Sequence, residues 1–446
     1  MYAEVILAEY LHRSLTYKIP VNLESQLKVG HAVLVPLRNR TVLGYIYSVK
    51  SEHHETFALK DILEIKSELT FFNEKTLQLL EWLAHYYATS ITDVIRSILP
   101  VGARSGKKWH DQYALPFVQN ALTALVETRQ VELTKDQNET VSRILRARDK
   151  PHLVHGVTSS GKTEVYLAIM RQMLIEGKST LILVPEIPLT YVLSERLRQE
   201  YGDRVFVVHS GLTDKERRLA WLGIHHATAS IVVGTRSAVF APIQNLGLII
   251  MDEEQDSAYK QEQTPRYNAR VVAFKRSLLE RALLVMGSAT PLVSTYFQAK
   301  KHYLISTMAQ RYRNVSLPQV DLINLKETGN FPRRLLSNEL VNAIKKTLSE
   351  GEQVMLLYNQ RGLSKLLRCE SCGEPVTCPR CSVSFTLHND QRLKCHYCGV
   401  SREKVSTCPA CGSGKLIAVG KGIQALQTEL RTTFPSARLD RLDGDT

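Results

Sequence analysis

A phosphate-binding pattern lies between residues 156 and 163. The segment reads Gly156-Val157-Thr158-Ser159-Ser160-Gly161-Lys162-Thr163, which matches G-x4-G-K-[ST] in full. An apolar segment precedes it and a helical pattern follows it, which is the context that this pattern requires. Backbone N–H groups of such a loop surround phosphates, the lysine reaches the β- and γ-phosphates, and the threonine hydroxyl binds Mg²⁺. The sequence therefore predicts a nucleoside triphosphate site, with a chance Gly/Ser-rich turn as the alternative.

Two carboxylates complete the pattern of a nucleotide site further along the chain. Asp252 and Glu253 directly follow the apolar segment 248–251. A carboxylate at the carboxyl end of a buried parallel strand lies beside the phosphate loop in this kind of fold, so Asp252 is predicted to hold Mg²⁺. Glu253 is then placed to orient or deprotonate the attacking water. A solvated acidic turn is the alternative.

All eight cysteines lie between Cys369 and Cys411, in four C-x2-C pairs separated by 5, 13 and 9 residues. Two such pairs complete a tetrahedral zinc site with four cysteine ligands, so eight thiolates predict two closed structural zinc ions. Disulfides, a redox C-x-x-C and an iron–sulfur cluster are the alternatives. Spacing alone does not decide the pairing, but the 13-residue loop is a usual zinc-ribbon span. The favoured ligand sets are Cys369, Cys372, Cys408 and Cys411 for one zinc, and Cys378, Cys381, Cys395 and Cys398 for the other. His388 and His396 are then surplus.

The composition limits the classes of protein that could carry these sites. The 446 residues suggest about three domains. Hydrophobic residues make up 44% and charged residues 23%, which excludes wholesale disorder and collagen-like repeats. A net charge of +13 suits a polyanionic partner such as nucleic acid, although it can also serve solubility alone. No apolar stretch approaches the length of a membrane span, and no secretory signal is visible, so we expect a cytosolic protein without membrane contact.

Residues 1–105 are predicted to form a small β-rich module, here called the N-terminal module. Expected strands are 5–8, 15–20, 32–36 and 42–49, and a helix is expected to follow Asn73, a good N-cap residue. Residues 106–130 are polar and basic at their start, which suits a linker.

Residues 131–325 alternate short apolar strands with helical stretches, which predicts a parallel sheet covered on both faces, here called the α/β lobe. Expected strands are 153–155, 181–184, 205–208, 231–233, 248–250 and 283–285. A second, incomplete lobe is expected over 326–446, with helices at 338–350 and 422–431 and strands at 353–358 and 437–440. The cysteine segment 369–411 interrupts this lobe.

The motifs together resemble superfamily 2 helicases, whose G-K-T, D-E-x-x and S-A-T motifs match 161–163, 252–255 and 288–290. The resemblance implies ATP and Mg²⁺ as cofactors, a RecA-like fold, and Gln137 as the residue that reads adenine. Pro185, Thr235 and Arg236 would grip DNA phosphates.

A two-zinc insert in the second lobe narrows the resemblance to the family of primosomal protein N-prime, the bacterial PriA replication-restart helicases. The matching segments include Trp82–Tyr87, Gly161–Tyr166, His209–Gly211, Gly234–Ala238, Asp256–Gln261 and Arg361-Gly362. The resemblance implies ATP-dependent 3′-5′ DNA unwinding at stalled or abandoned forks, and a 3′-end-binding N-terminal module. It also implies primosome assembly, with forked and single-stranded DNA, other primosome proteins, the replicative helicase loader and single-stranded DNA-binding protein as partners in the bacterial cytoplasm.

Several positions depart from the family pattern. Gln255 stands where the family has His, and Asn268 where His is common. Pro265 stands where Trp or another large residue is often seen, and Thr16 where an acidic residue is often found. Residues 106–130 leave room for no more than a remnant of a winged helix. The chain is expected to be truncated before the G-T-Q-M and Q-x-x-G-R-A-G-R motifs. The alternative functions are therefore a catalytically impaired DNA-fork-binding zinc protein and an unrelated P-loop ATPase with a zinc ribbon.

Overall fold

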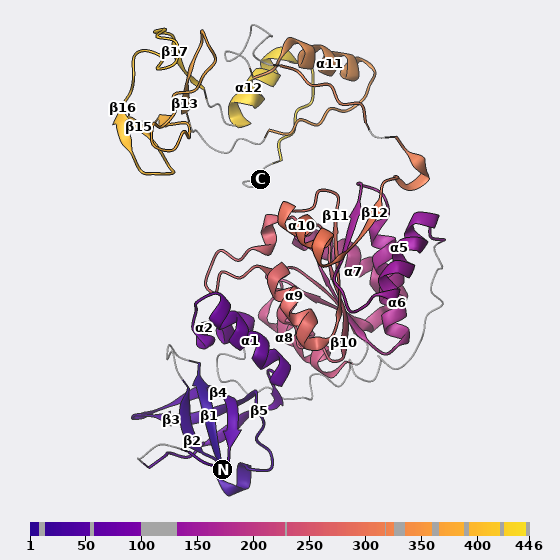
Figure 1. Ribbon diagram of the computed structural model, residues 1–446, viewed down its shortest axis with the longest axis vertical. Coiled ribbons are helices and arrows are strands. Elements are labelled where there is room, and N and C mark those ends of the chain that lie inside the picture. Colours follow the sequence, from indigo (N-terminus) through magenta and orange to yellow (C-terminus); the bar gives the residue numbers. More distant parts are fainter. Residues whose placement is uncertain are drawn as a thin grey trace. The chain divides into compact units, whose positions relative to one another are not determined.

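The computed structural model (Figure 1) describes residues 1–8, 14–53, 58–99, 132–227, 230–316, 318–324, 335–358, 365–387, 392–419 and 423–442. The chain divides into two compact units, Met1–Ser316 and Leu317–Thr446. The predicted linker 106–130, Arg361-Gly362 and His388 lie outside the described residues. No helix within the described ranges combines the length and apolar character that a membrane crossing requires.

The N-terminal module is a five-stranded antiparallel sheet followed by two helices. Its elements are β1 (Tyr2–Leu7), β2 (Leu15–Lys18), β3 (His31–Leu37), β4 (Arg40–Lys50), β5 (Glu64–Thr70), α1 (Glu74–Tyr86) and α2 (Ile91–Ile98), with strand order β2-β1-β4-β3-β5. The four predicted strands are confirmed, and β3 and β4 pair as an antiparallel hairpin. β5 was not predicted. Asn73 caps α1 as predicted, because its side chain accepts a hydrogen bond from the Thr76 N–H at 2.9 Å.

The α/β lobe contains a seven-stranded parallel sheet. Its strands are β6 (His152–Gly156), β7 (Ser179–Leu183), β8 (Val205–Val208), β9 (Ile231–Gly234), β10 (Leu246–Met251), β11 (Leu283–Ser288) and β12 (Leu304–Met308), in the order β12-β6-β11-β10-β7-β9-β8. All six predicted strands are confirmed. β12 was not predicted, because Ser306 and Thr307 interrupt its apolar pattern.

Helices cover both faces of this sheet (Figure 1). They are α5 (Lys135–Arg146), α6 (Lys162–Ile175), α7 (Ile187–Tyr201), α8 (Asp214–His226), α9 (Ala269–Glu280) and α10 (Val293–Lys301). Side chains alternate along each strand, so Ile249 and Met251 of β10 join the core under α8 to α10, while Leu248 and Ile250 join the core under α5 to α7. Burial on both faces explains why the central strands are continuous apolar runs.

The N-terminal module packs on the α8–α9 face of the lobe. Phe71, just after β5, lies 5.3 Å from Trp221 of α8 between ring centroids, and both belong to one continuous core. At the end of α1, the Tyr87 hydroxyl accepts a hydrogen bond from the Asn268 N–H at 2.9 Å. The module and the lobe are therefore joined by both apolar and polar contacts.

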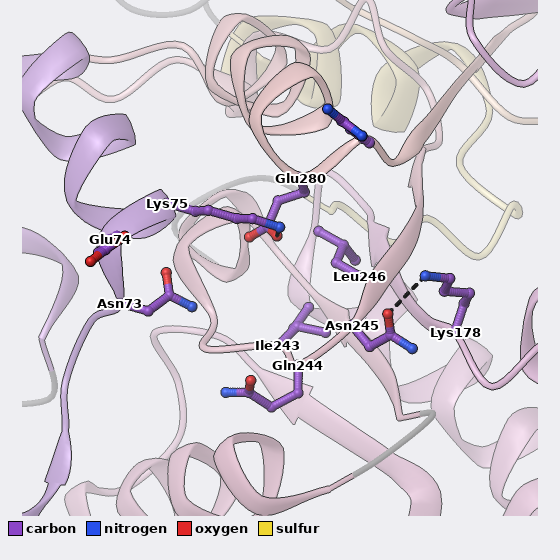
Figure 2. Close-up of a pocket in the computed structure, with 10 residues that line it drawn as sticks. Asn73, Glu74, Lys75, Lys178, Ile243, Gln244, Asn245, Leu246 and Glu280 are labelled. Atoms are coloured by element: carbon purple, nitrogen blue, oxygen red, sulfur yellow. Dashed lines mark hydrogen bonds and ion pairs between the residues drawn. The ribbon is translucent and has the colours of Figure 1, made fainter.

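A polar cavity of about 580 Å³ lies where the start of α1 meets the lobe (Figure 2). Lys178 on its rim donates a hydrogen bond to Asn245 at 2.8 Å, as the dashed line shows. The cavity opens at the amino ends of β7 and β10, whereas the phosphate loop follows the carboxyl end of β6. It is therefore not the nucleotide site.

The second unit contains α11 (Asn338–Ser349), α12 (Ile423–Thr433) and an antiparallel sheet of five short strands. These are β13 (Lys365–Cys369), β14 (Thr386–Leu387), β15 (Arg392–Lys394), β16 (Ser401–Glu403) and β17 (Leu416–Val419). The two predicted helices are confirmed. The strands predicted at 353–358 and 437–440 are wrong, since neither segment pairs with a strand in the described part of the chain. Met355 and Leu357 are consequently 96% and 95% exposed.

Candidate nucleotide and zinc sites

The phosphate loop is formed by the turn from β6 into α6. Ser159 and Gly161 adopt left-handed backbone conformations, with φ of 65° and 80°, and Gly161 immediately precedes the first turn of α6. The unpaired N–H groups at the start of a helix attract anions. Lys162 is only 9% exposed, and its Nζ donates a hydrogen bond to the Gly156 carbonyl at 3.0 Å. The lysine ammonium is thus folded back over the loop in which a phosphate would lie.

Asp252 lies at the carboxyl end of β10 and is held from two sides. The Tyr166 hydroxyl of α6 donates a hydrogen bond to Asp252 Oδ1 at 3.0 Å, and the Tyr259 hydroxyl donates to the Asp252 carbonyl at 2.6 Å. Gly287 of β11 makes this arrangement possible, because a Cβ there would lie 1.5 Å from the Tyr166 hydroxyl oxygen. The carboxylate is therefore fixed beside the first turns of the phosphate-loop helix.

The electrostatics of Asp252 suit a metal ligand. Burial, and then the neighbouring Glu253 carboxylate, raise the pKa of Asp252, while Tyr166 and Lys162 act in the opposite direction. A buried carboxylate beside another carboxylate is stabilised in its charged form by a nearby cation. Carboxylate and hydroxyl oxygens are also the ligands that Mg²⁺ prefers, so the side chains of Asp252 and Thr163 have suitable chemistry. Their assignment as Mg²⁺ ligands stays a prediction.

Gln255 joins the carboxylate motif to the Ser-Ala-Thr motif. Its Nε2 donates a hydrogen bond to Glu253 Oε2 at 2.8 Å, and its Oε1 accepts one from the Ser288 hydroxyl at 2.6 Å. Ser288 Oγ in turn accepts from the Thr290 N–H at 2.9 Å. Glu253 has a left-handed φ of 46°, a conformation that is unfavourable for a residue with a side chain. The amide side chain of Gln255 therefore holds Glu253 through a continuous hydrogen-bond chain.

Glu254 faces the protein interior and forms a buried ion pair. Its side chain is 0% exposed and lies 2.9 Å from Arg270, which belongs to α9. Glu254 also accepts hydrogen bonds from the Thr295 hydroxyl and the Leu292 N–H, at 2.9 and 2.8 Å. This carboxylate therefore connects the loop after β10 with the starts of α9 and α10.

We expect Arg270→Ala to destabilise the α/β lobe strongly. Removing one partner of a buried pair leaves an uncompensated charge and lowers the free energy of unfolding by about 3–5 kcal/mol. Thermal unfolding of the variant checks this, with Arg198→Ala as control, because Arg198 pairs with Glu195 on the exposed surface of α7. Equal melting temperatures of the two variants would contradict the importance of the pair.

Gln137 contacts the phosphate loop from α5. Its Oε1 accepts a hydrogen bond from the Thr134 N–H at 2.8 Å in a capping box, and its Nε2 donates to the Ser160 carbonyl at 3.1 Å. The side chain is 2% exposed. Gln137 thus braces the loop, and its reading of adenine stays a prediction.

The three residues predicted to grip DNA phosphates follow adjacent strands of the lobe. Pro185 comes after β7, and Thr235 and Arg236 come after β9. The Arg236 guanidinium donates hydrogen bonds to the Ala258 and Lys260 carbonyls, so it anchors the loop that follows the carboxylate motif. Their contact with DNA stays a prediction.

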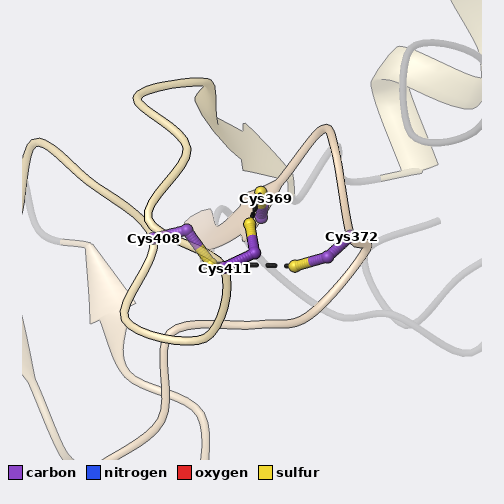
Figure 3. A group of neighbouring side chains, drawn as sticks. All are labelled: Cys369, Cys372, Cys408 and Cys411. Atoms are coloured by element: carbon purple, nitrogen blue, oxygen red, sulfur yellow. Dashed lines mark hydrogen bonds between the residues drawn. The ribbon is translucent and has the colours of Figure 1, made fainter.

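The eight cysteines form two groups of four in the second unit, the same groups that the sequence favours. Within each group the possible ligand atoms all lie within 4.8 Å of one another. Figure 3 shows Cys369, Cys372, Cys408 and Cys411, with the Cys369–Cys411 and Cys372–Cys408 sulfurs 3.5 and 3.7 Å apart. In the other group the Cys378–Cys398 and Cys381–Cys395 sulfurs are 3.5 and 3.3 Å apart. These separations exceed the ~2 Å of a disulfide and approach the ~3.8 Å edge of a tetrahedron built from zinc–sulfur bonds of about 2.3 Å. Both groups fit zinc.

Each C-x2-C pair has the same local backbone. The residue after the second cysteine is left-handed in all four, with φ of 73°, 56°, 75° and 73° at Gly373, Ser382, Gly399 and Gly412. Its N–H donates to the carbonyl of the first cysteine at 2.8–3.0 Å. Glycine adopts this conformation without strain at three of the four positions, whereas Ser382 occupies it without that advantage.

Three family models match the chain. They are the 3′DNA-binding domain of PriA over residues 4–100, the DEAD/DEAH box helicase over 134–297, and the Cys-rich region of PriA DNA helicase over 378–402. The replication restart protein PriA of Bacillus subtilis is 42% identical over 72% of this chain and 41% of its own length. The Rickettsia conorii protein is 32% identical over 97% of this chain and 65% of its own length. The Chlamydia trachomatis protein is 31% identical over 100% of this chain and 70% of its own length.

The chain belongs to the PriA family. The predicted family and the predicted fold class, a RecA-like lobe with a β-rich module before it and a Cys-rich zinc region after it, are confirmed. The chain spans about two fifths to two thirds of the first PriA relatives that it matches. The helicase match implies ATP and Mg²⁺, and the two four-cysteine groups suit two zinc ions.

Two residues of the candidate nucleotide site were not assigned a role from the sequence. Tyr166 lies one helical turn after Lys162, and this spacing places both side chains on one face of α6. Tyr259 lies seven positions after Asp252, and its hydroxyl donates a hydrogen bond to the Asp252 carbonyl. Helix periodicity could have indicated that Tyr166 lies on the same face of α6 as Lys162, whereas the contacts of Tyr166 and Tyr259 with Asp252 depend on how distant segments meet.

Proposed function

We propose that the protein is an ATP-dependent 3′-5′ DNA helicase that acts at stalled or abandoned replication forks and initiates primosome assembly. The observation that carries this proposal is the hydrogen-bond chain from Glu253 through Gln255 to Ser288, beside Lys162 and Asp252. Such a chain connects the carboxylate expected to orient water with a motif on a neighbouring strand. ATP hydrolysis can thereby be linked to movement of the lobe along DNA.

In this proposal, different residues bind the phosphates, hold Mg²⁺ and orient the attacking water. Lys162 and the loop N–H groups bind the phosphates, Asp252 and Thr163 hold Mg²⁺, and Glu253 orients the attacking water. The N-terminal module would bind the 3′ end of a nascent strand, and the lobe would bind single-stranded DNA. We further propose bacterial cytoplasm as the compartment. The proposed protein partners are other primosome proteins, the replicative helicase loader and single-stranded DNA-binding protein.

An unwinding assay on forked DNA tests the proposal. We expect ATP-dependent strand release from forks that carry a nascent strand with a free 3′ end, and no release by Glu253→Gln, which keeps the phosphate loop intact. Fork binding without ATP-dependent release would instead favour the alternative, a catalytically impaired DNA-fork-binding zinc protein.

Replacement of Gln255 tests the proposed link to hydrolysis. Gln255→Ala removes both contacts that join Glu253 to Ser288. We therefore expect DNA-stimulated hydrolysis to fall by about tenfold, since one hydrogen bond to a charged carboxylate and one from a neutral hydroxyl are lost. Steady-state rates with and without single-stranded DNA, alongside the affinity for ATP, measure this.

Gln255→His is the matched control, because a histidine can also hydrogen-bond to both neighbours. It should retain most of the stimulation by DNA. If Gln255→Ala keeps full DNA stimulation, the hydrogen-bond chain does not link the two activities.

A further inference from the structure

The segment after β12 runs along the outer side of the phosphate loop. The Val157 N–H donates a hydrogen bond to the Met308 carbonyl at 3.1 Å, and the Tyr312 N–H donates to the Ser159 carbonyl at 2.9 Å. Tyr312 begins a short 3-10 turn, Tyr312–Asn314. Two backbone hydrogen bonds therefore fix the position of Tyr312 against the loop.

The sheet order indicates on which side of the phosphate loop the base of a bound nucleotide would lie. Asp252, which fits Mg²⁺ at the terminal phosphates, follows β10, and the order β12-β6-β11-β10 places β10 and β12 on opposite sides of β6. The phosphates of a nucleotide lie in series between the metal and the nucleoside. The nucleoside of a bound nucleotide would therefore lie on the β12 side of the loop.

Within the described part of the chain, hydrogen bonds join the loop on that side to Gln137, Met308 and Tyr312. Only Tyr312 among these carries an aromatic ring, and it is 55% exposed, while Gln137 is 2% exposed. The Arg313 guanidinium lies 5.5 Å from the centre of the Tyr312 ring. An exposed ring beside a cation is a suitable surface for a flat, electron-rich base.

We propose that the base of the bound nucleotide stacks on Tyr312, which makes Tyr312 a base-binding residue of this motor. The inference rests on the proposed ATP-dependent function and specifies how that site takes the nucleoside. Stacking contacts the flat ring face, which every base has, and makes no hydrogen bonds with the edges of the base. Stacking on Tyr312 alone therefore does not distinguish adenine from guanine, and any discrimination between them would come from the predicted contact of Gln137 with the base edge.

Calorimetric titration of the full chain with Mg²⁺·ADP and with inorganic tripolyphosphate tests the inference. Tyr312→Ala keeps the backbone N–H that binds Ser159 and removes only the ring. We expect the dissociation constant for ADP to rise by about tenfold, within the range for loss of one base–aromatic stack, and that for tripolyphosphate to change by less than about twofold. Tyr312→Trp should retain ADP affinity.

Phe297→Ala is the matched control, because Phe297 is 52% exposed and Lys301 lies 4.4 Å from its ring centre on α10 of the same lobe. It should bind both ligands as the unaltered chain does. Unchanged ADP affinity in Tyr312→Ala, or equal losses of ADP and tripolyphosphate binding, would overturn the role of Tyr312 alone. If the unaltered chain binds neither ligand, the proposed ATP-dependent function fails, and this inference fails with it.

Discussion

Lys162→Ala is expected to abolish measurable binding of Mg²⁺·ATP. The Lys162 ammonium is buried against the loop and already lies 3.0 Å from the Gly156 carbonyl, so it meets an incoming phosphate with little reorganisation. Loss of one partner from a buried charge pair weakens binding by roughly a hundredfold or more. Equilibrium binding of a fluorescent ATP analogue measures the effect without requiring hydrolysis.

Lys178→Ala is a suitable control for general loss of positive charge. Lys178 belongs to the same lobe, but its ammonium lies 2.8 Å from Asn245 at the amino ends of the strands, away from the loop. It should bind ATP normally. ATP binding that survives in Lys162→Ala would refute the assignment of the loop.

Removal of zinc is expected to unfold the Cys-rich segment of the second unit. The core around the sulfurs contains few large apolar residues, among them Leu367, Phe385 and Leu393, while zinc binding to a structural site contributes about 10–16 kcal/mol. We expect about two zinc ions per chain and about one in Cys395→Ser, because three thiolates bind zinc far more weakly than four. Metal analysis and circular dichroism before and after chelation measure both effects.

His396→Ala is the control, since His396 lies between Cys395 and Cys398 and is not part of either four-cysteine group. It should retain two zinc ions. A zinc content near zero in the unaltered chain, or visible absorbance of an iron–sulfur cluster, would reject the assignment of two zinc sites.

The sequence predicts best what is encoded locally. The phosphate loop, the C-x2-C pairs and the Asn73 cap are recognisable within a few residues, and the central strands are apolar because both faces of the sheet are covered. The resemblance to a known family additionally predicted the order of the N-terminal module, the α/β lobe and the Cys-rich segment along the chain. The boundaries at residues 105, 130 and 325 stay predictions, as do the roles of the individual site residues.

The features that were missed depend on contacts between distant segments. Tyr166 and Asp252 are 86 positions apart, and Gln255 and Ser288 are 33 apart, so no local pattern pairs them. The segment 353–358 has the composition of a strand but lacks a neighbour to pair with in the described residues, and strand composition alone does not form a sheet. Gln255 was noted as a departure from the histidine of the family pattern, and the structure identifies Glu253 and Ser288 as its two hydrogen-bond partners.

The two four-cysteine groups are nested, and this order has a kinetic consequence for metal loading. The inner site joins Cys381 to Cys395, 14 positions apart, whereas the outer site joins Cys372 to Cys408, 36 positions apart. The entropy lost on closing a loop grows with its length, so the inner site closes more readily in an unfolded chain. Once the inner ion is bound, it shortens the length of free chain between the two outer cysteine pairs. The inner zinc should therefore be taken up first and released last.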